Sequence, residues 1–349
     1  MISNGQEFDD VMFDVGAVEK GAWVPGPYGP DDEKGTFNEV TPEKTARALA
    51  MLDLTRPVKT YNLSETLFNG FPAFNDREYK QVLRITGYKP PADFQGLCPE
   101  PEAIGNNHIS THEERVALTY NMGTKINGLT HVGVGPMYYN GFTGPEIART
   151  WGTTRLGIEN VGPIVTRGVL VDVVGYKAAH GDEADLFWLE GAAEPIIRGN
   201  YRITVEDIEA TLDWEGFQGE IEPGDVVLLR TGWRQLITAD PRRYSNDLPP
   251  GPFLREARYL AARRPAIVGI DVWCFGIIDP AVDGGNPCCC HQELFTKYGI
   301  RIGEAVPSDP LARDRVYEFV FCFNPTNAKG AVAANSPPMG LGQLTAGMS

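Results

Sequence analysis

The chain has 349 residues, of which 42% are hydrophobic, and a formal net charge of −15 at pH 7. This composition is typical of a soluble globular protein, and the length allows one large domain or two small ones. An acidic surface is repelled by nucleic acid and anionic membranes, so we expect neither as a partner. The polar, acidic start is unlike a signal peptide, and no apolar run approaches the ~18–20 residues that span a bilayer, which predicts a cytoplasmic protein.

The first 40 residues are rich in Gly, Pro, Asp and Glu, which predicts an irregular N-terminal arm over 1–40. Thr41 is the expected N-cap of a helix over 42–52, because Pro42 is well tolerated at the first helical position. The apolar residues of this helix, which we expect to face the core, are Ala46, Leu49, Ala50 and Met51. No later stretch reads as a linker, so we expect one compact domain over 41–349.

Apolar runs alternate with helical patterns from residue 165 onward. The β-branched run 165–174 predicts a strand buried on both faces, and Thr204 with Asp207 forms a capping box that opens a helix. Further strands are predicted at 226–233, 266–273 and 316–323. A helix is predicted over 253–264, with Leu254, Ala257, Leu260 and Ala261 on its buried face. The alternation of strands and helices over 165–273 indicates an α/β fold.

Six cysteines are present, and a long cytoplasmic chain is expected to keep them as free thiols. Three of them are adjacent, at Cys288, Cys289 and Cys290, and His291 follows directly. Zinc sites usually space their cysteines two to four residues apart, whereas three adjacent side chains do not easily converge on one ion. We therefore expect small buried residues on a close-packed turn here rather than a zinc site.

The segment 121–141, NMGTKINGLTHVGVGPMYYNG, reads as a metal-binding segment whose ligands have been exchanged. Its frame of Gly123-Thr124, His131 and Tyr139-Asn140-Gly141 resembles the signature of the cyclase-like hydrolase superfamily, which includes bacterial kynurenine formamidase and isatin hydrolase. Other segments resemble the family in the same order, at 29–43, 61–64, 157–163, 167–173, 223–233 and 291–304. The resemblance implies an α/β fold with a central mixed β-sheet or β-barrel ringed by helices, and a homodimer or higher homo-oligomer.

The departures from the family concern its metal ligands. In the family, two histidines and an aspartate of the signature bind a divalent ion, and the matching positions here are Asn121, Lys125 and Asn127. Asparagine is a weak neutral ligand, and a protonated lysine has no lone pair and repels a cation. We therefore expect no metal and no other cofactor, with a retained zinc or manganese ion as the alternative. The segment could also have become purely structural, but burying a lysine without a role or partner is costly.

The resemblance assigns an acid–base role to His131. It also matches His291 and Glu304 to a second pair of residues, which in the family can ligate a second ion or contact the site. Without an ion, that pair would orient a proton donor or balance Lys125, or else form a purely structural hydrogen bond. Residues that could bind the substrate are Asn121, Asn127, Tyr139, Phe68, Phe71 and Trp273.

These residues allow three functions. A metal-independent hydrolase of a small amide, lactam, lactone or ester would use Lys125 as the electrophile and His131 as the general base, with His291 or Glu304 as the second proton-transfer group. Its difficulty is the loss of metal-bound hydroxide as nucleophile. A lyase, dehydratase or cyclase acting on a small carbonyl compound needs no activated water, and Lys125 could even form a Schiff base. The third function is non-catalytic binding of a small molecule.

Overall fold

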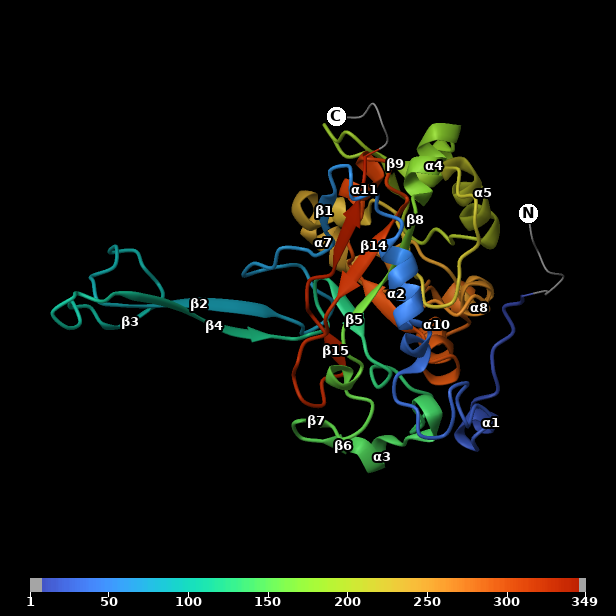
Figure 1. The fold of residues 1–349 in the computed structure, drawn as a ribbon, viewed down its shortest axis with the longest axis horizontal. Helices are drawn as coiled ribbons and strands as arrows, with labels where there is room; N and C mark the ends of the chain where they lie inside the picture. Colours follow the sequence, from blue (N-terminus) through green and yellow to red (C-terminus); the bar gives the residue numbers. More distant parts are fainter. Residues whose placement is uncertain (1–7, 345–349) are drawn as a thin grey trace.

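The computed structural model describes residues 8–344, and a nine-stranded mixed sheet forms the centre of this part (Figure 1). In sheet order its strands are β1 (Lys59–Asn62), β16 (Met339–Gly342), β14 (Glu318–Phe323), β8 (Ile164–Val171), β11 (Val226–Leu229), β12 (Ile267–Ile270), β13 (Arg301–Glu304), β5 (Lys125–Asn127) and β15 (Ala333–Ala334). The run β8-β11-β12-β13 is parallel, and the flanking strands pair antiparallel. The sheet curls into a half-barrel ringed by helices, which confirms the expected fold class.

The helices and the remaining strands surround this sheet. The helices are α1 (Val15–Glu19), α2 (Pro42–Leu49), α3 (Gly144–Ile147), α4 (Val173–His180), α5 (Val205–Glu215), α6 (Leu236–Ala239), α7 (Pro241–Asn246), α8 (Leu254–Ala261), α9 (Pro280–Asp283), α10 (Cys289–Gln292) and α11 (Asp309–Arg313). A π-helical turn, Glu293–Lys297, continues α10, and short 3-10 turns span Gly35–Glu39, Tyr139–Gly141, Ile158–Asn160, Glu183–Asp185 and Trp233–Gln235. The small sheets contain β2 (Tyr79–Thr86), β3 (Leu97–Glu100) and β4 (Thr111–Leu118), then β6 (Ala148–Arg149) with β7 (Gly152–Thr153), and β9 (Leu186–Phe187) with β10 (Ile196–Ile197). None of the helices within 8–344 has the length and apolar character to cross a membrane.

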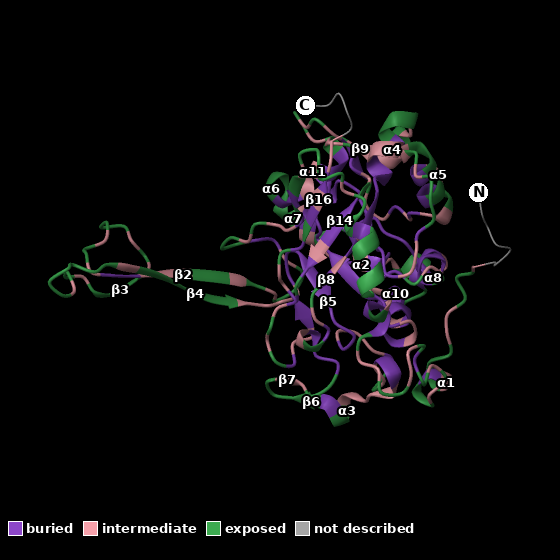
Figure 2. Ribbon diagram, in the orientation of Figure 1, coloured by how far each residue is buried: buried purple, intermediate pink, exposed green. Residues whose placement is uncertain are grey.

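The parallel strands form the core, and they are buried at almost every residue (Figure 2). Apolar runs of this kind occur where both faces of a sheet are covered. The strand predicted at 165–174 is confirmed, but it ends at Val171. There Asp172 accepts a hydrogen bond from the Gly175 amide and caps α4, so the last two valines of the run are helical.

Local sequence signals, a capping box for α5 and an apolar face for α8, predicted two helices well. The Thr204 hydroxyl accepts from the Asp207 amide at 3.1 Å, and the Asp207 carboxylate accepts from the Thr204 amide at 2.9 Å, so α5 begins with the expected capping box. In α8 all residues of the predicted apolar face are buried: Leu254, Ala257, Leu260 and Ala261.

Helix α2 corrects one prediction. Its N-cap is Thr41 as expected, but Leu49 and Met51 are exposed, and Lys44 and Ala48 face inward instead. The reason is electrostatic: the Lys44 ammonium lies 2.6 Å from the fully buried carboxylate of Asp225. A buried carboxylate needs a partner of opposite charge, and this need overrides the apolar pattern.

Strands β2, β3 and β4 form an arm, residues 79–118, that projects from the body of the molecule (Figure 1). The two long strands pair antiparallel along their whole length, from Tyr79 opposite Leu118 to Thr86 opposite Thr111. Most of β4 is exposed (Figure 2). The sequence did not predict this projection. The predicted N-terminal arm over 1–40 and the single domain over 41–349 stay predictions, and residues 1–7 lie outside the described part.

Candidate active site

The signature segment enters the sheet as β5, which pairs antiparallel with β13. In this register Lys125 lies directly opposite Glu304, and directly opposed residues have side chains on the same face of a sheet. The Lys125 ammonium is 2.7 Å from Glu304 Oε2, and the two residues are only 2% and 1% exposed. The segment is fixed nearby by Thr124, whose hydroxyl donates to the Ala305 carbonyl. Lys125 is therefore half of a buried ion pair.

Glu304 is the central residue of a buried polar cluster that also contains Lys125, Asn127 and His291. Besides Lys125, its Oε2 accepts from the Asn127 side-chain amide at 2.9 Å. Its Oε1 accepts from the Phe275 backbone amide at 2.7 Å and lies 3.0 Å from His291 Nε2. Burial alone would raise the pKa of Glu304, but the Lys125 charge and the His291 hydrogen bond outweigh it and hold that pKa well below its usual range. The carboxylate is therefore ionised, and each of its two oxygens already has two polar partners.

His291 reaches the cluster from α10, on the opposite side of the carboxylate from Lys125. Its Nε2 contacts Glu304, whereas its Nδ1 is buried and has no hydrogen-bond partner within the described part of the chain. The structure places His291 and Glu304 in direct contact, and Lys125 contacts the same carboxylate.

His131 is partly buried, and its ring meets the ring of Phe295 edge-on at 6.4 Å between centroids. Burial, and next the positive charge of Lys125, lower the pKa of His131 to about 3. At physiological pH this imidazole is neutral. It can therefore accept a proton, but it does not carry the additional proton that a cationic imidazolium would donate.

The predicted substrate-binding residues are distributed more widely. Asn127 belongs to the Glu304 cluster, and the side-chain oxygen of Asn121 is buried without a partner in the described residues. Tyr139 is fully buried, and its hydroxyl donates to Asp32 at 2.8 Å, which ties it to the N-terminal segment. The aromatic candidates form two separate pairs: Phe68 with Phe71, edge-on at 5.4 Å, and Trp273 stacked on Phe74 at 4.7 Å.

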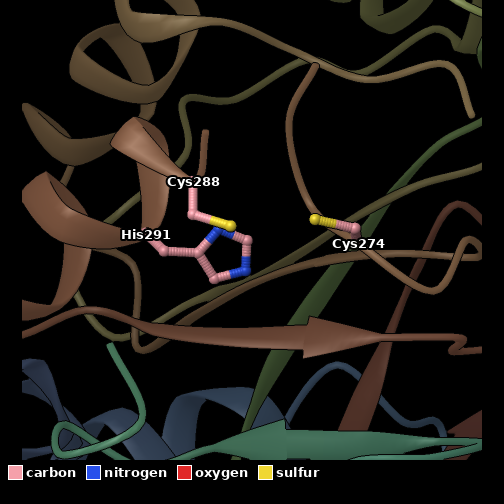
Figure 3. A group of neighbouring side chains, drawn as sticks. All are labelled: Cys274, Cys288 and His291. Atoms are coloured by element: carbon pink, nitrogen blue, oxygen red, sulfur yellow. The ribbon is translucent and has the colours of Figure 1, made fainter. Parts of the chain in front are cut away.

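The structure adds two cysteines that sequence reasoning did not place in the site. A sulfur atom from each of Cys274 and Cys288 and a ring nitrogen of His291 all lie within 4.8 Å of one another (Figure 3). Cys289 and Cys290 are buried in the core, as expected for a close-packed turn. Cys288 departs from that expectation because it precedes α10 in a left-handed conformation, with φ of 60°, and is only partly buried. The run Cys288–His291 was visible in the sequence, but no local signal set Cys288 apart from Cys289 and Cys290.

The signature positions do not fit a divalent ion. Lys125 presents an ammonium group there, which has no lone pair and repels a cation. Asn121 and Asn127 offer only neutral amide oxygens, which are weak ligands, and the Asn127 amide N–H is directed at Glu304. The nearby Cys274, Cys288 and His291 could hold an ion, and all three lie outside the signature segment 121–141.

Comparison with known proteins identifies the family. A family model described as "Putative cyclase" matches residues 52–276, more than half of the chain. The chain belongs to the cyclase family. The resemblance to cyclase-like hydrolases that the signature predicted is thereby confirmed. A search of curated proteins finds no match.

Solved structures share the fold of this cyclase-family chain. A crystal structure described as a novel cyclase is 24% identical, with 90% of this chain and 98% of that one covered and a TM-score of 0.73. Isatin hydrolase A from Ralstonia solanacearum is 17% identical, with 85% and 97% covered and a TM-score of 0.57. An isatin hydrolase bound to the product analogue thioisatinate is 16% identical, with 86% and 98% covered and a TM-score of 0.56. These likenesses show that the chain shares the fold of the three structures.

Proposed function

We propose that this protein is an enzyme that hydrolyses a small amide, lactam, lactone or ester and needs no metal ion at its signature positions. The observation that carries the proposal is the buried Lys125–Glu304 ion pair, with a contact of 2.7 Å, in the segment where the family places its ion. An ammonium group has three N–H donors, and one is directed at Glu304. The other two can stabilise the oxyanion that forms when a carbonyl carbon is attacked.

His131 is the proposed general base. Its neutral imidazole can take a proton from water across the physiological range, although a pKa of about 3 makes it a weak base at rest. Part of that low pKa comes from the charge of Lys125. As negative charge develops on a substrate oxygen beside Lys125, this repulsion is offset, and His131 becomes a stronger base at that point of the reaction.

Glu304 is a positioning residue in this proposal rather than a proton donor, because its carboxylate is ionised and accepts from four groups. It orients Lys125 and, on its other oxygen, His291. His291 is then the remaining candidate for the second proton-transfer group.

A lyase or cyclase acting on a small carbonyl compound is the second candidate. It is favoured by the poor fit of an ion at the signature positions, because elimination and cyclisation need no metal-bound hydroxide. Its Schiff-base version requires an unprotonated Lys125, which the ion pair with Glu304 opposes. Treatment with borohydride and a carbonyl substrate should therefore leave no adduct on Lys125 in a mass spectrum.

Oxygen-18 water separates the two candidates. The purified protein would be incubated with a panel of small aromatic lactams, formamides, lactones and esters, isatin among them. Hydrolysis must place one labelled oxygen in a product carboxyl group, whereas elimination or cyclisation need not. Retention of a compound without turnover of any would instead favour a binding protein.

Lys125→Met tests the proposed electrophile. We expect kcat to fall by roughly 100- to 1000-fold, as when an oxyanion donor is removed, with Lys125→Arg retaining more activity because it keeps the charge. Lys20→Met, at an exposed lysine, is the matched control and should behave as wild type. Full activity in a folded Lys125→Met variant would refute the role of Lys125.

A further inference from the structure

We propose that Cys274, Cys288 and His291 form a binding site for a thiophilic divalent cation, with zinc as the expected ion. The three donor atoms come from the loop after β12, from the residue before α10 and from α10 itself, and they lie within 4.8 Å of one another (Figure 3). Two thiolates and one imidazole nitrogen are ligands that zinc takes in proteins. The site is distinct from the signature positions, which present an ammonium group.

The imidazole is already oriented as a zinc ligand would be. His291 Nε2 lies 3.0 Å from Glu304, and a carboxylate on one ring nitrogen is the usual support for a metal on the other. The other nitrogen, Nδ1, lacks a hydrogen-bond partner in the described part of the chain, although His291 is only 2% exposed. A buried polar atom without a partner is costly, and a cation between Nδ1 and the two sulfur atoms would satisfy it.

The conformation of the chain explains how the sulfur atoms come together. Cys288 has a positive φ of 60°, so its side chain leaves the backbone in a different direction from those of Cys289 and Cys290, which are buried in the core. Cys274 is buried and follows the end of β12, and Figure 3 shows both sulfur atoms turned toward the imidazole. Both cysteines are free thiols, so they are available to an ion.

Charge also balances at this site. Lys125 and Glu304 neutralise each other across their 2.7 Å contact, so the lysine is not an uncompensated charge beside an ion. Two deprotonated thiols would then neutralise one divalent cation. Three protein ligands leave the fourth position of a tetrahedral zinc ion open, as in catalytic sites, whereas structural zinc usually has four. Cys288 is only partly buried, which leaves an approach to that position.

Zinc here would take His291 out of proton transfer but would leave the proposed roles of Lys125 and His131 unchanged. The inference therefore goes beyond the proposed function and can fail separately. Metal content tests this site, and the Lys125 variants test the electrophile.

The full-length protein, purified after expression with added zinc, would be analysed for metal by mass spectrometry. We expect about one zinc per chain, and Cys288→Ser should lower zinc affinity roughly tenfold or more. The matched controls are Cys98→Ser and Cys322→Ser, which remove partly buried thiols outside the site and should keep the metal. Circular dichroism would verify that each variant is folded, and Cys288 is preferred to the fully buried Cys274 for this reason.

Cobalt gives a second measurement that does not depend on activity. Cobalt-substituted wild type should show thiolate-to-cobalt charge-transfer bands, and Cys288→Ser should weaken them. Wild type that takes up neither zinc nor cobalt would overturn the proposal. So would zinc that persists unchanged in Cys288→Ser, or a Cys274–Cys288 disulfide in the metal-free native protein.

Discussion

At the scale of single residues, the site is a set of charges that constrain one another. Lys125 shares the Glu304 carboxylate with His291, and its positive charge also acts on His131. The lysine thus has two effects: against the effect of burial it lowers the pKa of Glu304, and together with burial, the larger cause, it lowers the pKa of His131. Both follow from a cation held in a fixed position on β5.

The protonation state of His131 can be measured directly. Its pKa of about 3 predicts an imidazole that stays neutral from pH 8 down to pH 5. Carbon–proton NMR spectra of the five histidines would show this, with His131→Asn used for assignment. Lys125→Met should raise the pKa of His131, because a like charge is removed. A wild-type His131 that titrates near its ordinary value of about 6.5 would contradict the expected burial and charge effects.

The same shift affects stability, with a defined sign. The folded pKa of His131 lies below its unfolded value, so the unfolded chain binds the proton more readily. The contribution of neutral His131 to stability is complete above about pH 6.5 and is lost as the pH falls toward about 3. The stability of His131→Asn, followed by urea unfolding, should therefore depend less on pH across this window.

At the scale of elements, a second buried charge cluster joins the carboxyl ends of neighbouring strands. Arg230 follows β11 and contacts Asp172 after β8 at 2.8 Å, Asp309 at the start of α11 at 3.2 Å, and Glu194. All but Glu194 are buried. Because a guanidinium group offers five donors in fixed directions, one arginine can hold these segments in a single arrangement.

Removing Arg230 should be strongly destabilising. In Arg230→Met the buried Asp172 loses its arginine partner, and the buried Asp309 keeps Arg234 at 3.1 Å, so the free energy of unfolding should fall by about 3–5 kcal/mol. Neutralising them as well, with Asp172→Asn and Asp309→Asn, should recover part of the loss. The control is Arg47→Met, at an exposed and loose ion pair, for which we expect a change within about 0.5 kcal/mol. Urea denaturation would measure all of these, and an Arg230→Met protein as stable as wild type would refute the cluster's role.

At the scale of the whole molecule, the projection of the arm of residues 79–118 is the feature that packing within a single compact chain explains least. Its exposed apolar side chains include Leu97, Ile109 and Val116. A ribbon of few strands is marginally stable in water on its own, so a covering partner would stabilise it. The family resemblance implies a homo-oligomer, and we propose that a second copy of the chain covers this arm.

Light scattering coupled to gel filtration tests that proposal. Wild type should be a dimer or a higher oligomer, and a variant with residues 81–116 replaced by a short Gly-Ser turn should be a monomer. Val116→Glu, a single exposed change on β4, should weaken the assembly in the same direction. A monomeric wild type, or a shortened variant that assembles unchanged, would show that the arm has another role.

The sequence by itself determined the parts that depend on local chemistry. The apolar runs of β8, β11 and β12, the Thr204 cap and the buried face of α8 were all predictable, because each depends on residues within a few positions of one another. The motif frame around Lys125 was also readable, and the match to the family confirms the resemblance that it indicated. These features were enough to predict the family and the fold.

Only the tertiary structure decided what depends on distant partners. Lys44 faces inward because the buried Asp225 carboxylate pairs with it. Cys274 and Cys288 come from two separate loops, and only the fold brings their sulfur atoms together beside His291. The antiparallel register of β5 on β13 placed Glu304 opposite Lys125. Burial of a charge or a thiol is decided by the groups that long-range packing brings to it. Those contacts leave no local pattern, and so the metal-ligand candidates and the projecting arm emerged only with the fold.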